Sequence, residues 1–385
     1  MKVQQFSPSV GQQEVFNLLD TLRDNWMTEG KWTARLEAMI RDRCGCSYAL
    51  MVPNGTLALF AALKVLGIGP GDEVLVPDFT FFGSASAVAL TGAKPVLVDV
   101  RASDFTMDPG AAERSIGPAT RCIMPVHIYG QTCDMAALTK LAQGHDLLMV
   151  EDAAQGMGVT CGDRHVGTFG DIGCMSFFAD KTITTGEGGV LLVNDQELAE
   201  RCMYFKNQGR LERGSFVHPQ MGYNFRITDM QAAIGVAQFE RIDAVIARKR
   251  EIVDLYREHL AAAPGIEWPA DNGLGQTVPF RANILVDHAE RLADFLSTKD
   301  IQARRFFYPL HRQPSLNADN AVVRETPKQS VRLFERGLSL PSSPDITTEE
   351  IRYVCSSITD FLGTAARPDR LTDRSALQCE PTPVS

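Results

Sequence analysis

Two segments of the chain carry residues that could do chemistry together. An apolar run ends in Glu151-Asp152-Ala153-Ala154-Gln155, and a second apolar run leads through Asp180 into Lys181. A carboxylate at the carboxyl end of a parallel strand lies where open α/β sheets bind ligands. A lysine just beyond a buried strand can lose its contact with water, which lowers the pKa of its amine. The neutral amine is then available to form a Schiff base.

A Schiff-base lysine and a carboxylate facing a pyridinium nitrogen are the two protein groups that pyridoxal phosphate requires. Each residue alone also has a structural interpretation, because Asp152 could cap a helix and Lys181 could be a surface lysine. Other cofactor patterns are weaker. The glycine-rich run 67–71 lacks the dinucleotide-binding spacing and precedes a strand, and the seven histidines show no metal-ligand spacing. No metal is therefore expected.

These residues need a scaffold that brings strand ends together. Apolar strands are expected at Glu73–Pro77, Pro95–Val100, Cys122–Val126, Leu147–Glu151, Ile172–Phe178 and Val190–Val193, with helical segments between them. Strands that alternate with helices in this way predict a mostly parallel sheet covered on both faces. The expected fold class is α/β.

The second half of the chain has a different pattern of predicted helices and strands. A long helix is predicted from Thr228 to Leu260, with Thr228 and Gln231 as its capping box. Beyond it we expect strands at Phe280–Val286 and Ile301–Tyr308 and helices at His288–Leu296, Val331–Arg336 and Thr348–Phe361. The predicted organisation is a large domain over 1–240 with a helical segment at 14–43, a small α+β domain over 241–365 that includes the long helix, and a disordered tail over 366–385.

Composition narrows the class of protein. The 385 residues are 44% hydrophobic and 22% charged, as in globular proteins, and no apolar run is long enough for a membrane span. The N-terminus lacks the apolar core of a secretory signal, so we expect a cytoplasmic protein. A net charge of −9 argues against nucleic acid as a partner, and an anionic substrate would need a local positive site. The nine scattered cysteines fit buried, reduced thiols.

Several further motifs follow one another from about residue 10 to residue 362. They are Pro53-Asn54-Gly55-Thr56, Val76-Pro77-Asp78-Phe79-Thr80-Phe81, Ser176-Phe177 ahead of Lys181 and Gly186-Glu187-Gly188-Gly189, Gly222-Tyr223-Asn224-Phe225-Arg226, Gln231-Ala232-Ala233-Ile234-Gly235, and Phe307-Tyr308-Pro309-Leu310-His311. With the Glu-Asp-Ala-Ala-Gln run, they make the chain similar to the sugar aminotransferases of the DegT/DnrJ/EryC1/StrS family. The resemblance implies aspartate aminotransferase fold type I, with a large domain that binds pyridoxal 5'-phosphate and a small C-terminal domain.

The resemblance also implies contacts to the cofactor ring. Lys181 would form the Schiff base and act as the base that moves protons. Asp152 would keep the pyridine nitrogen protonated, so that the ring withdraws electrons. Gln155 would lie near the ring hydroxyl, and Phe81 would stack on the ring, with core packing as the alternative for Phe81.

The phosphate of the cofactor would be held by a second group of residues. Gly55 and Thr56 open a helix, whose N–H groups hold a phosphate well, and Ser176 would add a hydroxyl. Asn224 resembles the residue that reaches the phosphate from a second subunit, so a homodimer with shared active sites is implied. The chain departs from the family pattern at Asn54, where serine is usual.

The activity implied is transfer of an amino group from L-glutamate to a nucleotide-linked keto sugar in two half-reactions, giving an amino sugar for a surface polysaccharide. The Lys181–Gly189 run is most similar to the perosamine synthase branch, which aminates C4 of GDP-linked 4-keto-6-deoxymannose. A pyridoxal-phosphate-dependent sugar dehydratase is one alternative, but those relatives carry histidine in place of Lys181. A non-catalytic regulator that binds the same cofactor is another, although it would not need Asp152, Phe81 and Asn224 together.

Contacts to the nucleotide sugar are expected from three segments. The segment 205–214 could supply a local positive site for a diphosphate, or it could be a solvated loop. The candidates are Lys206, Arg210 and Arg213 in that segment, Arg226 near the predicted subunit boundary, and His311 after the small-domain strand.

Overall fold

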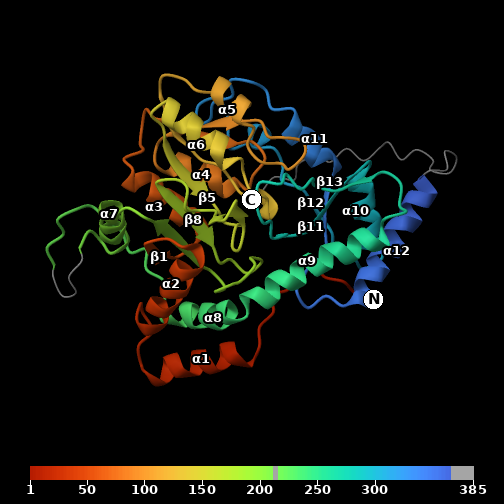
Figure 1. Cartoon of the computed structure of the whole chain (residues 1–385), viewed down its shortest axis with the longest axis horizontal. Helices are drawn as coiled ribbons and strands as arrows, with labels where there is room; N and C mark the ends of the chain where they lie inside the picture. The colour runs from red at the N-terminus through yellow and green to blue at the C-terminus, as the bar shows by residue number, and fades with distance from the viewer. Residues whose placement is uncertain (211–215, 366–385) are drawn as a thin grey trace, which may run out of the picture.

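The fold contains a seven-stranded sheet and a four-stranded sheet with a long helix between them (Figure 1), and a small two-stranded hairpin. The computed structural model describes residues 1–210 and 216–365, so the predicted tail 366–385 and the candidate Arg213 lie outside the described residues. Among the residues described, no helix is both long and apolar enough to cross a bilayer.

The first unit contains the larger sheet. Its helices are α1 (Gln12–Arg23), α2 (Lys31–Cys44), α3 (Gly55–Val65), α4 (Phe82–Leu90), α5 (Pro109–Arg114), α6 (Met135–Gly144), α7 (Gln196–Lys206) and α8 (Asp229–Glu240), with a 3-10 turn η1 (Ile128–Gly130). Its strands are β1 (Tyr48–Val52), β2 (Glu73–Pro77), β3 (Lys94–Val98), β4 (Thr120–Ile123), β5 (Leu148–Asp152), β8 (Ile172–Ser176) and β9 (Gly189–Val193), with a small hairpin of β6 (Thr160–Cys161) and β7 (Arg164–His165).

The second unit is smaller and antiparallel. It contains α9 (Ile242–His259), β10 (Ile266–Glu267), β11 (Ala282–Val286), α10 (Ala289–Thr298), β12 (Arg304–Arg305), η2 (Leu310–Arg312), α11 (Gln329–Arg336), β13 (Gly337–Leu340) and α12 (Thr348–Ala365). Its strands are ordered β10-β11-β13-β12. Val3 forms a parallel bridge with Ile301, so the first residues of the chain lie against this unit.

The larger sheet has the strand order β1-β9-β8-β5-β4-β2-β3. Only β9 runs against its neighbours, and the pairs from β8 through β3 are all parallel. The α/β prediction with a mostly parallel sheet is confirmed. As a consequence, the carboxyl ends of β2, β4, β5 and β8 meet at one edge of the sheet, which is where such sheets bind ligands.

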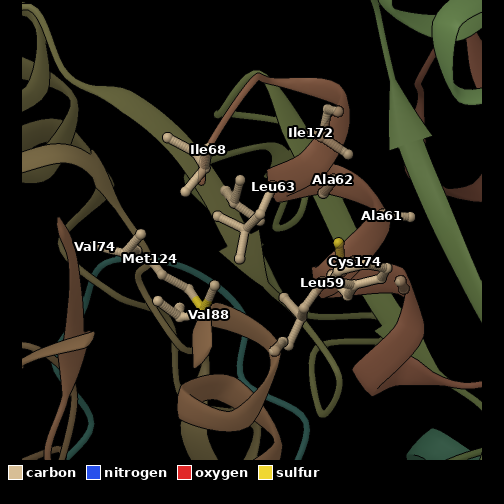
Figure 2. Packing of buried hydrophobic residues seen from close by; sticks show 14 of the residues in the cluster. Leu59, Ala61, Ala62, Leu63, Ile68, Val74, Val88, Met124, Ile172 and Cys174 are labelled. Atoms are coloured by element: carbon tan, nitrogen blue, oxygen red, sulfur yellow. The ribbon is translucent and has the colours of Figure 1, made fainter. Parts of the chain in front are cut away.

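Helices cover both faces of this sheet because alternate side chains along each strand point to opposite sides. Cys174 packs in the cluster formed with α3, whereas its neighbour Met175 packs in the cluster formed with α2 and α8. Figure 2 shows Leu59 and Leu63 of α3 in the same cluster as Ile172. Each fully buried leucine of this kind contributes about 1.5–3 kcal/mol.

Three predicted elements differ from the structure. The helical segment 14–43 is two helices, and the predicted helix over Thr228–Leu260 is broken at Arg241, although its capping box is present. Arg241 leaves helical geometry where its guanidinium reaches Glu14 of α1 at 2.6 Å. The strand predicted at 301–308 shortens to β12. Ile301 pairs with Val3, and after Phe306, whose N–H still bonds the carbonyl of Gly337, the Phe307 ring stacks on Tyr129 of the first unit.

Candidate active site

Asp152 is the last residue of β5, and its carboxylate is buried. Ser84 of α4 donates its hydroxyl to Oδ2 at 2.7 Å, and the N–H of Ala154 donates to Oδ1 at 3.1 Å. Burial raises the pKa of Asp152, while these two hydrogen bonds and the charge of Lys181 oppose that rise. The chain after Asp152 turns toward β6 and starts no helix, so Asp152 is not a helix cap.

The neighbouring Glu151 has a different environment. It accepts hydrogen bonds from three backbone N–H groups of the 167–170 turn and lies 3.1 Å from Nε2 of the buried His127. Burial would raise the pKa of Glu151, but His127 and the N–H groups outweigh it and lower the pKa. Burial likewise opposes a charge on His127, but Cys133 and Glu151 raise its pKa to about 10. Glu151 therefore fixes the end of β5, which leaves Asp152 as the carboxylate for chemistry.

Lys181 follows β8 and is mostly enclosed. Its Nζ lies 4.7 Å from the centroid of the Phe280 ring and 3.9 Å from the carboxylate of Asp180. Burial lowers the pKa of Lys181, and the nearby Arg281 lowers it further, whereas Asp180 and Asp152 oppose the shift. This is the environment that was expected for an amine with a neutral fraction near pH 7.

The N-terminus of α3 lies beside the end of β8. A Cβ atom on Gly55 would come within 2.9 Å of the Cβ of Ser176, so only glycine lets the two elements approach this closely. Asn54 caps α3 by accepting the N–H of Leu57 at 2.9 Å, which explains the departure from the usual serine, because asparagine is an equally good cap. The first N–H groups of α3 thus sit next to the Ser176 hydroxyl, an arrangement suited to an anion.

Phe81 lies at the other side of this N-terminus and is 59% exposed. A Cβ on Gly83 would lie 3.0 Å from the Thr56 hydroxyl and 3.1 Å from the Phe81 ring, so these two side chains flank Gly83. The edge of the Phe81 ring meets Phe307 at 6.1 Å between centroids. Its exposure excludes the core-packing alternative and leaves a ring surface available to a ligand.

Gln155 lines the same small pocket as Ser176 and Lys181. Its Oε1 accepts the N–H of Tyr129 at 2.6 Å. Tyr129 has a positive φ of 53°, a strained conformation for a side chain of this size. Gln155 therefore supports the turn after β4, and its amide nitrogen is the group left to meet a ring hydroxyl.

Asn224 is exposed on the segment that follows α7, where it forms a backbone bridge with Asn207. Arg226 donates its Nε to the Asn224 side-chain oxygen and its Nη1 to the Asn207 side-chain oxygen, both at 3.0 Å. This pairing occupies the oxygen of the Asn224 amide and directs its N–H donors elsewhere.

Lys206 is placed differently from the expectation. It is buried and pairs with Glu29, with Glu37 at 3.9 Å. Its charge is thereby compensated inside the first unit, which argues against the predicted contact with a diphosphate.

The remaining substrate candidates are split between two places. Arg210 lies at the end of the described segment after α7, with its guanidinium 5.7 Å from the Phe216 ring centroid. His311 lies at the ligand-binding edge of the large sheet, because its backbone N–H and its Nδ1 both meet the carboxylate of Asp78 at 2.7 Å. Asp78 directly follows β2, and it is buried.

Comparison with known proteins agrees with this geometry. Residues 8–359 match the DegT/DnrJ/EryC1/StrS aminotransferase family. The chain belongs to this family. It is 35% identical to GDP-perosamine synthase of Vibrio cholerae, over 92% of this chain and 98% of that one, and 37% identical to GDP-perosamine synthase of Escherichia coli O157:H7, over 92% and 97%. The solved structure of DesV from S. venezuelae superposes with a TM-score of 0.86 at 31% identity, covering 93% of this chain and 95% of that one.

As a member of the aminotransferase family, the chain is a pyridoxal-phosphate-dependent enzyme. The residues present fit this cofactor. The α3 N-terminus and Ser176 form a cradle for a phosphate, and the exposed Phe81 ring can cover an aromatic ring. The buried carboxylate of Asp152 and the mostly enclosed amine of Lys181 are groups of the kind that the cofactor's nitrogen and aldehyde would require.

Sequence reasoning missed several residues of this aminotransferase site. No role was predicted for Ser84, although a hydroxyl near the start of α4, soon after the end of β2, is a signal that sequence reasoning can use. Asp180 was noted as a neighbour of Lys181, but its 2.6 Å ion pair with Arg281 joins residues about 100 positions apart and leaves no local signal. Asp78 was part of a quoted motif without a role.

Proposed function

We propose that this aminotransferase moves the amino group of L-glutamate onto a nucleotide-linked keto sugar, with GDP-linked 4-keto-6-deoxymannose as the acceptor and an amino sugar for a surface polysaccharide as the product. The observation that carries the proposal is the placement of the buried Asp152 carboxylate and the mostly enclosed Lys181 amine at the ligand-binding edge of the sheet. The GDP-perosamine synthases among the relatives support the choice of acceptor.

When bound, pyridoxal phosphate forms a covalent bond with an amine and withdraws electrons from the adjacent carbon of the substrate. Lys181 supplies the amine for that bond, and once released the same Nζ can take a proton from the substrate carbon and return it. Asp152 holds a proton on the ring nitrogen, because its carboxylate is fixed by Ser84 and by the N–H of Ala154.

The diphosphate of the acceptor needs cations that the cofactor does not use. Arg210 and Arg226 are the proposed contacts, since Asn207 binds both of them beside Asn224. Arg213 lies outside the described residues and stays a candidate from the sequence alone. His311 is proposed to meet the sugar, because Asp78 orients its ring at the sheet edge. Charge-assisted hydrogen bonds to phosphate are about twice as strong as neutral ones, so they favour a nucleotide sugar over a free sugar.

L-glutamate should change the visible absorbance of the bound cofactor, and a keto sugar should restore it. We expect a nucleotide-linked 4-keto-6-deoxy sugar to restore the absorbance at least about 100-fold faster than the free keto sugar. The reason is that two charge-assisted hydrogen bonds to the diphosphate contribute about 3 kcal/mol or more. Stopped-flow absorbance measures both rates. Comparison of GDP-, dTDP- and UDP-linked sugars identifies the nucleotide, and the GDP-linked mannose derivative should react fastest.

Two other outcomes would replace the proposal. If α-keto acids restore the absorbance and every nucleotide sugar is inert, the enzyme is a general amino-acid aminotransferase. If the sugar loses water without any amino donor, the dehydratase alternative holds. Binding of the cofactor with neither reaction would favour the regulator.

A homodimer with shared active sites is also part of the proposal. Around Asn224 the surface carries large exposed apolar side chains, with Phe216 87% and Met221 81% exposed. Exposed apolar residues that gather on one segment are typical of an interaction site. Pairing of two copies there would cover these residues and bring each Asn224 amide to the phosphate cradle of the other subunit.

Mixing Lys181→Ala with Asn224→Ala protein should restore activity, because in a mixed dimer one site receives both intact residues. With random exchange, up to about a quarter of the parent activity is expected. The matched control is a mixture of Lys181→Ala with Asp152→Asn, since these residues belong to one chain and should show no rescue. Absence of rescue in the first mixture, with subunit exchange demonstrated by native mass spectrometry, would rule out the shared site.

We also propose that the enzyme works in the cytoplasm. The eight cysteines among the described residues are all free, and seven of them are buried. Unpaired thiols are typical of a reducing compartment.

A further inference from the structure

The Phe280 ring, just before β11, is surrounded by cations. The centroid of the ring lies 4.7 Å from Nζ of Lys181, 5.0 Å from the guanidinium carbon of Arg281 and 5.7 Å from Nζ of Lys249. An aromatic face attracts one cation, but several cations on one ring repel one another. Attraction to the ring therefore does not explain why Lys249 lies there in addition to Lys181 and Arg281.

Lys249 is the unexpected member of this group. Along α9 the buried positions are Ile242, Val245, Ile246, Lys249, Ile252 and Tyr256, so a lysine occupies a place in an apolar stripe. The side chain is only 2% exposed, and its Nζ donates to the carbonyl oxygen of Phe280 at 3.1 Å. The Phe6 ring lies on it at 5.8 Å.

The charges near Lys249 are not balanced. Arg281 pairs with Asp180 at 2.6 Å, and that carboxylate also lies 3.9 Å from Lys181 and from Arg304. Among the ion pairs found in the described part of the chain, none includes Lys249. The charged groups that face this region are four cations, Lys181, Lys249, Arg281 and Arg304, and two carboxylates, Asp180 and Asp152.

A purely structural role does not explain this residue. Burial of an amine costs free energy unless it is paired, and a methionine would fill the same space in the apolar stripe without that cost. The hydrogen bond from the ammonium group to one carbonyl offsets only part of the cost of burying the charge.

We propose that Lys249 is a positioning residue for Lys181, which holds the Phe280 ring against the Lys181 side chain and places a second positive charge beside it. The proposal deepens the function above, because it rests on Lys181 being the reactive amine. Repulsion from Lys249 disfavours the ammonium form of Lys181 and so increases the fraction of neutral amine at neutral pH.

The direction of this effect follows from the surroundings. Burial, with Arg281 and Lys181 nearby, lowers the pKa of Lys249 to about 8, so Lys249 is still mostly charged at pH 7. Because the ring centroid lies 4.7 Å and 5.7 Å from the two Nζ atoms, these atoms are at most about 10 Å apart. Two charges at that separation in a protein interior shift each other by about one pKa unit.

Three variants separate the hydrogen bond from the charge. Lys249→Gln keeps a donor for the Phe280 carbonyl but has no charge, Lys249→Met loses both, and Lys249→Arg keeps both. The readout is the reactivity of Lys181 toward trace acetic anhydride between pH 6 and 11, measured on its peptide by mass spectrometry in the full chain without added cofactor. The reactivity reports the neutral fraction of the amine and needs no turnover.

The Gln and Met variants should lower the reactivity of Lys181 at pH 7 about tenfold, because the charge of Lys249 that they remove is still present at that pH. The Arg variant should match the parent. A Gln variant with the parent reactivity at pH 7 would overturn the proposal even if Lys249→Met fails to fold, since Gln keeps the hydrogen bond. Borohydride reduction of the cofactor-loaded parent enzyme, which fixes the cofactor on the lysine that binds it, tests the role of Lys181 itself. Failure of the Lys249 proposal can therefore be distinguished from failure of the proposed function.

Discussion

An alanine at position 181 should leave a folded protein that still retains pyridoxal phosphate but has lost at least about 1,000-fold of its turnover. The phosphate cradle at Gly55, Thr56 and Ser176 is independent of the lysine side chain, so the cofactor should remain bound. Both the covalent bond and the proton transfer depend on Nζ of Lys181, and no other amine lines the pocket that it shares with Gln155. The loss should therefore appear in both half-reactions.

Borohydride reduction checks the assignment chemically. In the parent enzyme the cofactor should become fixed to the peptide that contains Lys181, and in the alanine variant no lysine should be labelled. Lys249 is the informative comparison, because it is the other lysine whose Nζ lies near the Phe280 ring. The assignment of Lys181 as the reactive amine would be wrong if the label appeared on Lys249. It would also be wrong if Lys181→Ala kept the visible absorbance of a covalent adduct.

Much of the fold could be predicted from periodicity, because long alternating runs report burial directly. What could not be predicted were places where contacts between distant segments override the local pattern. Arg241 sits in a sequence that favours one continuous helix, yet its ion pair with Glu14 of α1 coincides with a break. The predicted strand at 301–308 contains residues with strand preference, but sheet contact ends at Phe306, whose N–H bonds Gly337, and the Phe307 ring stacks on Tyr129.

The site divides in the same way. Asp152 and Lys181 could be found because each follows an apolar strand, and a parallel sheet must bring strand ends together. The environment of a cation could not be found by the same reasoning. Lys206 and Lys249 are both lysines in helices, but Glu29, 177 residues away from Lys206, neutralises the first, whereas the second has a carbonyl as its hydrogen-bond partner. Only the tertiary structure separates these two cases.

Replacing Asp152 with asparagine should lower turnover by at least about 100-fold while leaving the cofactor-free protein as stable as the parent, or more stable, at pH 7. Burial raises the pKa of Asp152, so the stability that its protonated form provides is present below the ordinary carboxyl pKa and is lost as the pH rises through the raised value. At neutral pH the parent protein has lost that stability because Asp152 is charged, whereas the asparagine variant has no charge to bury. The amide can still pair with the Ser84 hydroxyl, so the local structure should persist.

Glu151→Gln is the matched control, because it changes the adjacent carboxylate in the same strand in the same way. The pKa of Glu151 is lowered, so its charge stabilises the fold at neutral pH and that stability is lost as the pH falls through the lowered value. An amide there would leave buried His127 without its charge partner, and the unfolding free energy should fall by about 3 kcal/mol or more. Thermal unfolding of both cofactor-free variants and the parent at pH 5 and 7 measures the two changes in stability. A carboxylate that binds a cofactor is expected to lower the free energy of unfolding of the cofactor-free protein and to raise the turnover of the loaded enzyme. If Asp152→Asn destabilised the protein as much as Glu151→Gln and kept near-parent turnover, Asp152 would therefore be a structural residue.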